Sequence, residues 1–253
     1  MIVCKSAAEI EKMRAANQVV SDVLAELAAM VAPGVTTADL DEAAERLVRA
    51  AGAQPAFKGY RGYPATLCAS VNEQVVHGIP ANRKLRDGDI ISLDMGVKLN
   101  GFFGDSAITV PVGRVSDEVM RLLRVTQEAL DKGIEQVRPG GRISDIGHAI
   151  QQHVESNGFS VVREFVGHGI GAALHEEPQI ANYGDPGRGP RLAEGMVLAI
   201  EPMVNMGRPA VKVLADGWTA VTRDGSLSAH FEHTVAVTKD GSSVLTQRIP
   251  VPL

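Results

Sequence analysis

A repeat with a spacing of 106 residues constrains the fold of this chain more than any other feature of its sequence. Val31-x-Pro33-Gly34 returns as Val137-x-Pro139-Gly140, and five more positions keep the same spacing. These are the pairs Asp39 and Asp145, Leu40 and Ile146, Ala43 and Ala149, Val48 and Val154, and Gly52 and Gly158. A chain of 253 residues suits one large domain or two intimate halves. We expect a single domain, residues 1–253, made of two related halves at roughly 1–110 and 111–253.

Four carboxylates lie beside short runs of apolar and β-branched residues, which are typical of sheet strands. They are Asp94 after residues 90–93, Asp105 before residues 106–110, Glu201 after residues 197–200, and Glu232 before residues 233–237. An isolated ionised carboxylate in such a place is costly, so it must be paired or hold a metal. These four acids therefore predict a site for divalent cations.

The repeat indicates that the four acids meet. Asn100-Gly101 lies between Asp94 and Asp105 and predicts a hairpin that brings the second acid back towards the first. A register of 107 residues, set by Leu85-x-x-Gly88 and Leu192-x-x-Gly195, places Glu201 opposite Asp94, and Glu232 aligns with Asp105. Two halves that face each other would bring all four carboxylates to one central point.

One histidine completes this set of candidate ligands. His168 lies in the glycine-rich segment 165–171, where the flanking glycines let a metal or substrate approach the imidazole closely. Oxygen-rich sites with one imidazole suit Mn, Fe, Co or Zn. Two such ions, bridged by carboxylates and a water, form a known hydrolytic arrangement.

Helix signals open each half. Ser6 and Glu9 form a capping-box pattern, and a second helix is predicted over residues 37–51. Ser116 and Ser144 are the predicted starts of a third and a fourth helix. Strands and turns follow each pair of helices, and this separation into blocks predicts an α+β fold with antiparallel strands.

Net charge, cysteine content and hydropathy limit the partners and the cellular compartment that we expect. A net charge of −5 gives no reason to expect nucleic-acid binding. The two cysteines, Cys4 and Cys68, do not suggest a disulfide framework. The N-terminus lacks a signal-peptide pattern, and no apolar stretch approaches the roughly 20 residues that span a bilayer. We therefore expect a cytoplasmic protein without membrane contact.

Several ordered motifs resemble type I methionine aminopeptidase over nearly the whole chain. They are Asn72-Glu73-x-x-Val76-His77-Gly78-Ile79-Pro80, Asp94, Asp105, Gly167-His168-Gly169-Ile170-Gly171, His175-Glu176-Glu177-Pro178, Ile200-Glu201-Pro202 and Phe231-Glu232-His233-Thr234. The resemblance implies the pita-bread fold, in which two pseudo-symmetric α+β halves with antiparallel sheet surround a dinuclear metal site. It also implies that residues 1–253 form a single catalytic domain.

The family's metal ligands transfer to five residues by matching position. Asp94 would hold one divalent ion, and His168 with Glu201 would hold the other, while Asp105 and Glu232 would bridge both. The resemblance implies two ions of Co, Mn, Fe or Zn and does not choose among them.

The resemblance also implies catalytic and substrate-binding roles. A bridging hydroxide would attack the peptide carbonyl, with Glu201 as the proton shuttle. His175 would stabilise the oxyanion, and His77 would hydrogen-bond the substrate from the other side. The residues that match the pocket for the methionine side chain are Tyr60, Tyr63, Cys68 and Trp218. Sulfur and aromatic groups suit a thioether.

Three residues depart from the commoner family pattern. Phe57 and Leu174 are expected to reshape the pocket. His230, two residues before Glu232, either changes the hydrogen bonds around the metal ligands or lies at the surface.

The activity implied is removal of the initiator methionine from nascent proteins when the second residue is small. A prolidase-like or X-Pro aminopeptidase is the main alternative, but those chains carry an additional N-terminal domain for which the first helix leaves no room. A non-catalytic binding protein with the same fold is the other alternative, although all five ligands are present. The expected partners are nascent polypeptide N-termini, with a transient ribosome contact, and we expect a monomer.

Overall fold

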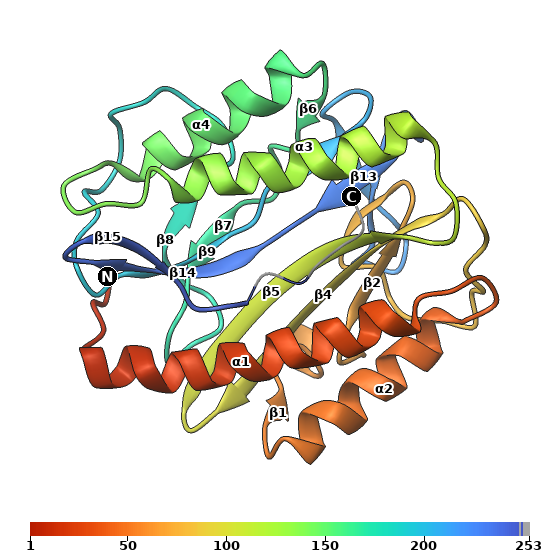
Figure 1. The fold of residues 1–253 in the computed structure, drawn as a ribbon, viewed down its shortest axis with the longest axis horizontal. Helices are drawn as coiled ribbons and strands as arrows, with labels where there is room; N and C mark the ends of the chain where they lie inside the picture. The colour runs from red at the N-terminus through yellow and green to blue at the C-terminus, as the bar shows by residue number, and fades with distance from the viewer. Residues whose placement is uncertain (248, 250–253) are drawn as a thin grey trace.

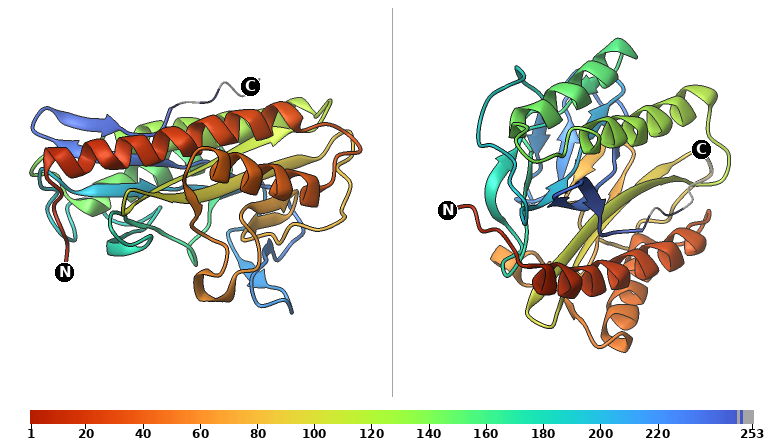
Figure 2. Two further views of the ribbon diagram at one scale, coloured as in Figure 1. Left: turned by 90° about the horizontal axis from the view of Figure 1, so that it is seen from below. Right: turned by 60° about the vertical axis from the view of Figure 1, so that its left-hand side comes forward.

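Pairs of helices alternate with groups of strands along the chain. The computed structural model describes residues 1–247 and 249. Its helices are α1 (Ala7–Met30), α2 (Thr37–Ala50), α3 (Asp117–Ile134), α4 (Ile143–Ser156) and a short 3-10 helix, η1 (Tyr60–Gly62). The four α-helices lie on one side of the strands (Figures 1 and 2). Residues 248 and 250–253, which end the predicted second half, lie outside the described residues.

Antiparallel pairing builds every sheet of the described residues. The strands are β1 (Gln54–Pro55), β2 (Cys68–Val71), β3 (Gln74–Val76), β4 (Ile90–Leu99), β5 (Phe102–Pro111), β6 (Ser160–Val161), β7 (Gly167–Gly169), β8 (Glu176–Ile180), β9 (Val197–Ile200), β10 (Met203–Asn205), β11 (Val211–Val213), β12 (Ala220–Thr222), β13 (Ser228–His230), β14 (His233–Thr238) and β15 (Gly241–Val244). One sheet has the order β1-β4-β2 with β5 on β4, and another has the order β15-β14-β9-β7-β8. Two smaller sheets have the orders β13-β10-β6 and β11-β12-β3. The predicted α+β class is confirmed.

Capping side chains set the helix starts. The Ser6–Glu9 capping box at α1 is confirmed, and Ser116 caps α3 as predicted. The prediction that Ser144 starts α4 is wrong, because the N-cap is Arg142 and the helix begins one residue later. The Ser144 hydroxyl instead accepts a hydrogen bond from the backbone N–H of Arg188, at 2.7 Å. The serine oxygen is occupied by a distant loop and does not cap the helix, and no local pattern in the sequence indicates that contact.

The hairpin at Asn100-Gly101 is confirmed, with φ of 51° and 86° at the two residues. Asp94, however, does not end its strand as expected. It lies in the middle of β4, because pairing with β5 continues along the whole strand to Leu99. Asp105 likewise lies inside β5, opposite Gly96. The two acids are diagonal neighbours on one face of the hairpin.

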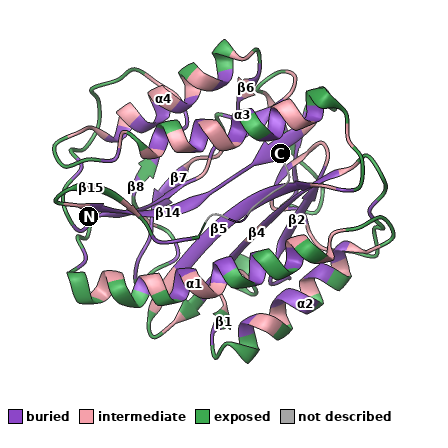
Figure 3. Ribbon diagram, in the orientation of Figure 1, coloured by how far each residue is buried: buried purple, intermediate pink, exposed green. Residues whose placement is uncertain are grey.

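A continuous apolar core fixes these central strands. Leu24 and Leu27 of α1 are fully buried, as are Ile91 and Leu93 of β4 and Leu122 of α3. Each such side chain contributes about 1.5–3 kcal/mol through burial. Figure 3 shows the long strands as buried and the outer faces of the helices as exposed. The acids of β4 and β5 therefore stand on strands that are packed into this core.

Within the described residues, none of the helices is both long and apolar enough to cross a bilayer.

Candidate metal centre and substrate pocket

One cavity of about 150 Å³ collects all the side chains that the sequence singled out for metal or substrate. Its lining includes the predicted ligands Asp94, Asp105, His168, Glu201 and Glu232, and the predicted substrate residues Tyr60, Tyr63, Cys68, His77, His175 and Trp218. These residues come from segments far apart in the chain, so the fold brings them together.

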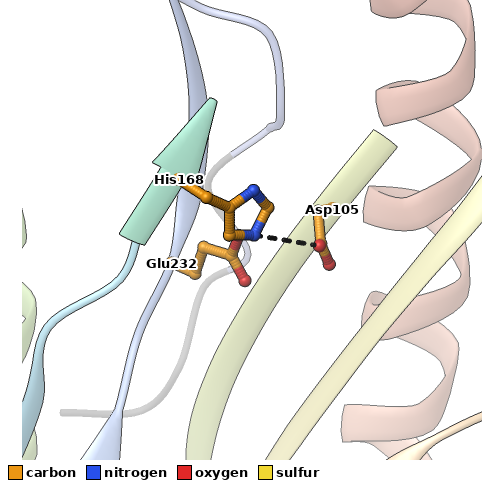
Figure 4. A group of neighbouring side chains, drawn as sticks. All are labelled: Asp105, His168 and Glu232. Carbon is orange, nitrogen blue, oxygen red and sulfur yellow. Dashed lines mark ion pairs between the residues drawn. The ribbon is translucent and has the colours of Figure 1, made fainter. Parts of the chain in front are cut away.

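Acid and imidazole groups meet at one end of this cavity. Ligand atoms of Asp105, His168 and Glu232 all lie within 4.8 Å of one another (Figure 4). The Nε2 atom of His168 is 3.9 Å from Asp105 Oδ2 and 3.6 Å from Glu201 Oε1. These separations are too long for direct hydrogen bonds and leave space between the groups.

Hydrogen bonds to backbone carbonyl groups hold Asp105 and Glu232 in place. The backbone N–H of Glu232 donates to the carbonyl of Ala107, at 2.9 Å. Ser106 Oγ donates to the Glu232 carbonyl at 2.7 Å, and Thr234 Oγ1 donates to the Asp105 carbonyl at 2.8 Å. These hydrogen bonds fix the backbone from which each carboxylate projects.

Glu201 and His168 are placed by the neighbouring strands. Glu201 directly follows β9, and Asn182 Nδ2 donates to its carbonyl at 3.0 Å. His168 lies on β7, where it pairs with Ala199 of β9. The two side chains therefore leave adjacent strands towards the same cavity.

Burial makes negative charge costly at this end of the cavity. It raises the pKa of Asp94, Glu201 and Glu232 well above the usual range, and repulsion from the neighbouring carboxylates adds to the effect. Burial also raises the pKa of Asp105 to about 7. Among the described residues, Asp105 Oδ1 and Glu232 Oε1 are buried without a hydrogen-bond partner. Such groups need either protons or cations, and carboxylate oxygens with one imidazole nitrogen fit divalent transition metals.

The imidazole of His168 is neutral, and its Nε2 atom is oriented so that it can act as a metal ligand. Burial lowers its pKa to about 4, so it is uncharged at neutral pH. Its Nδ1 lies 2.9 Å from the carbonyl of Gly169, which can only accept a hydrogen bond. The proton is therefore on Nδ1, and the lone pair of Nε2 faces the acids.

Comparisons with known proteins agree with this geometry. Residues 11–239 match the family model described as Metallopeptidase family M24. The chain belongs to metallopeptidase family M24. It is 56% identical over 247 residues to methionine aminopeptidase 1 of Bacillus subtilis, covering 98% of this chain and 100% of that relative. It is 54% identical over 246 residues to the methionine aminopeptidase of Clostridium perfringens, covering 97% and 99% of the two chains.

Solved structures of M24 proteins share the architecture. The crystal structure of the Thermotoga maritima methionine aminopeptidase is 48% identical, with a TM-score of 0.96, and the match covers 98% of this chain and 100% of that one. The prolidase from Pyrococcus furiosus, at 21% identity and a TM-score of 0.79 over 97% of this chain and 66% of that one, shares the fold alone. The expected pita-bread fold is confirmed, and membership of M24 makes the chain a hydrolase that requires divalent metal.

Two further histidines of this M24 chain line the cavity. The ring of His175 stacks on Tyr60 at 5.2 Å, and its Nδ1 is 2.9 Å from the Tyr60 hydroxyl. Its pKa is lowered, mainly by burial and then by the charge of Arg61. His77 meets Trp218 edge-on at 6.2 Å, and burial lowers its pKa to about 4. Both rings are therefore neutral hydrogen-bonding groups near pH 7.

The remaining pocket residues present a mostly apolar surface. The Tyr63 hydroxyl lies 3.0 Å from the carbonyls of Leu67 and Gly78, and its ring meets Trp218 edge-on at 5.1 Å. Burial raises the pKa of the Cys68 thiol well above its usual value, so the thiol is uncharged near pH 7. These are polarizable, neutral groups of the kind that suit a thioether.

The three departures from the family pattern take definite positions. Phe57 and Leu174 both line the cavity. His230 is only 1% exposed, so the surface alternative was wrong, and its Nε2 lies 3.7 Å from Glu201 Oε2. Arg61 also lines the cavity but was not predicted, because no pattern in the sequence places the short helix η1 there.

Proposed function

We propose that this M24 metallopeptidase is a methionine aminopeptidase, which removes the N-terminal initiator methionine from nascent proteins when the second residue is small. One observation carries the proposal. The cavity joins an acid-rich metal centre to a neutral pocket made by Tyr60, Tyr63, Cys68 and Trp218. A methionine side chain in that pocket would place its own peptide bond beside the acids. The names of the relatives support the same substrate.

The proposal assigns two divalent ions, of Co, Mn, Fe or Zn, to this centre. Asp94 would hold one ion, His168 and Glu201 would hold the other, and Asp105 and Glu232 would contact both. When bound, the ions supply Lewis acidity that activates water and polarises the scissile carbonyl. Three carboxylates with pKa values raised well above normal would be kept ionised by these charges.

Glu201 is the proposed proton shuttle. Its carboxylate lies at the acidic end of the cavity, 3.6 Å from His168 Nε2, and burial together with the neighbouring carboxylates raises its pKa well above the usual range, which favours a carboxyl that takes up a proton during the reaction. It would accept a proton from the attacking water and return it to the leaving amine.

His175 and His77 are the proposed hydrogen-bond donors to the substrate. When the Tyr60 hydroxyl donates to Nδ1 of His175, at 2.9 Å, the ring proton lies on Nε2 and can donate to the carbonyl oxygen as negative charge develops there. His77 would bind the substrate backbone from the Trp218 side of the cavity. Neutral rings suit this role because they donate without adding a fixed positive charge.

A peptide panel tests the proposal against its main alternative. Metal-reconstituted protein should release methionine from Met-Ala-Ser, release little from Met-Leu-Ser, and leave X-Pro peptides intact. Glu201→Gln should abolish turnover while the circular dichroism spectrum stays unchanged. Cleavage of X-Pro peptides in preference to Met-Ala-Ser would favour a prolidase-like enzyme. Undetectable Mn, Fe, Co and Zn after reconstitution would favour a non-catalytic binding protein.

The wider setting is also part of the proposal. The chain would act as a single catalytic domain of two halves, 1–110 and 111–253, because Asp94 and Asp105 come from one half and the other three ligands from the second. It would work as a cytoplasmic monomer on nascent polypeptide N-termini, with a transient ribosome contact. Co-sedimentation with translating ribosomes would test that contact.

A further inference from the structure

A lysine from the N-terminal segment is buried next to the turn that carries His175. Lys5 Nζ lies 2.6 Å from Glu176 Oε2, and only 4% and 14% of the two side chains are exposed. The same Nζ donates to the carbonyl of Val3, at 2.9 Å. Lysine is almost never this buried unless it is paired. The chemistry proposed above gives this ion pair no role.

Glu176 connects the lysine to the turn 171–176. Its second carboxylate oxygen, Oε1, accepts a hydrogen bond from the backbone N–H of Ala173, at 3.0 Å. The N–H of Gly171 donates to the Ala173 carbonyl at 3.1 Å, which closes the turn. A Cβ at Gly171 would collide with Lys5 Cε and Glu176 Oε1, so the pair packs directly against the turn.

The backbone around Lys5 is anchored independently. The N–H of Lys5 donates to the Gly195 carbonyl at 2.6 Å, and Phe103 of β5 donates to the Gly171 carbonyl at 2.9 Å. The N-terminal segment reaches this point just before α1 begins (Figure 1). The backbone of Lys5 is therefore held in place at Gly195, and the turn that its side chain reaches is also hydrogen-bonded to β5.

We propose that Lys5 is a positioning residue for His175. Through Glu176, the residue that follows His175, it fixes the turn so that the imidazole keeps its 5.2 Å stacking on Tyr60 and its 2.9 Å contact with the Tyr60 hydroxyl. This inference rests on the proposed function for what His175 does to the substrate. A displacement of about 1 Å in a group that contacts the reacting atoms can cost about 10²-fold in rate.

Lys5→Met tests the inference by removing the charge while keeping the side-chain length. We expect kcat for Met-Ala-Ser to fall about 10²-fold while KM changes less than about threefold, because transition-state contacts are lost and ground-state binding is kept. Lys132→Met is the matched control, since it removes an exposed 3.0 Å ion pair between Lys132 of α3 and Glu135, the C-cap of that helix, and should leave both constants unchanged. An unchanged kcat in Lys5→Met would overturn the inference.

A double-mutant cycle separates positioning from general stability. In a His175→Ala background, adding Lys5→Met should lower kcat by less than about threefold, because the group that Lys5 positions is already gone. A full further loss of about 10²-fold would mean that Lys5 acts by another route and would contradict the inference.

Hydrogen–deuterium exchange of residues 171–176 provides a readout without activity. In the metal-reconstituted protein, Lys5→Met should speed exchange in this turn and leave the central strands protected. The double variant Lys5→Met/Glu176→Gln, which leaves no unpaired buried carboxylate, should show the same local effect even where the single variant is poorly folded. Unchanged exchange in both variants would refute the role of Lys5. A wild-type protein inactive on Met-Ala-Ser would refute the proposed function alone, and the exchange data would still decide about Lys5.

Discussion

Without bound metal, the folded protein should become less stable as the pH rises from 7 to 9. Burial raises the pKa of Asp94, Glu201 and Glu232 well above normal, and that of Asp105 to about 7, whereas carboxyl groups of an unfolded chain ionise near pH 4. The native metal-free protein therefore keeps carboxyl protons at pH values where the unfolded chain has already lost them. Each such proton lowers the free energy of unfolding by about 1.4 kcal/mol per pH unit.

Buried histidines change the free energy of unfolding in the opposite direction at lower pH. Burial lowers the pKa of His77 and His168 to about 4 and that of His230 to about 3. Between these values and about 6.5, the unfolded chain binds histidine protons that the native protein does not, so this contribution to stability rises with pH. It opposes the carboxyl effect below about pH 6.5, and above about pH 7 it is constant and no longer changes stability with pH. In the higher range the acids therefore set the slope, joined towards pH 9 by the buried Cys68 thiol, whose raised pKa acts in the same direction.

Urea denaturation at pH 7, 8 and 9 measures how the stability of the metal-free protein depends on pH. The midpoint for chelator-treated protein should fall across the series, while Mn²⁺ at about 100 times its dissociation constant should add about 2.7 kcal/mol for each bound ion at each pH. Glu232→Gln removes one titrating group and should flatten the slope of the metal-free protein. A metal-free stability that stays level or rises from pH 7 to 9 would refute the argument that buried, uncompensated carboxylates form this site.

Three substitutions test other parts of the structure. His175→Ala should lower kcat for Met-Ala-Ser by about 10²–10³-fold with an unchanged melting temperature, since it removes a donor to the developing oxyanion; near-normal turnover would exclude that role. Gly104→Ala should cost about 1–3 kcal/mol in urea denaturation, because its Cβ would lie 2.8 Å from the backbone nitrogen of Asn17 in α1. Thr109→Val should cost about 1–3 kcal/mol in the same assay, because the buried hydroxyl donates to the His230 carbonyl and accepts from the His230 N–H, each at 2.8 Å. Wild-type stability in either variant would show that the local contact is not maintained.

Local signals in the sequence predicted much of the fold. The capping box at Ser6 and the Asn100-Gly101 turn are both decided within a few residues, and both are found in the structure. The β-branched runs beside the acids predicted strands for the same reason. The repeat added the long-range information that single elements lack, since it indicated that acids more than 100 residues apart would meet.

Tertiary contacts account for what the sequence did not show. Asp94 lies mid-strand because cross-strand pairing with β5 continues past it as far as Leu99, whereas the apolar run before it ends at Leu93. Serine is favoured at helix N-caps, but the Ser144 hydroxyl accepts a hydrogen bond from the backbone of Arg188 instead. The burial of His230 and the place of Arg61 at the cavity depend on packing between distant segments. These features depend on contacts between residues far apart in the sequence, so no local sequence pattern predicts them.

Anomalous X-ray diffraction from crystals of Mn²⁺-loaded protein tests the central claim most directly. We expect two manganese peaks inside the cavity, in contact with the carboxylates of Asp94, Asp105, Glu201 and Glu232 and with Nε2 of His168. A cavity without an anomalous peak in protein that is loaded with Mn²⁺ and active on Met-Ala-Ser, or peaks held by other residues, would contradict the account.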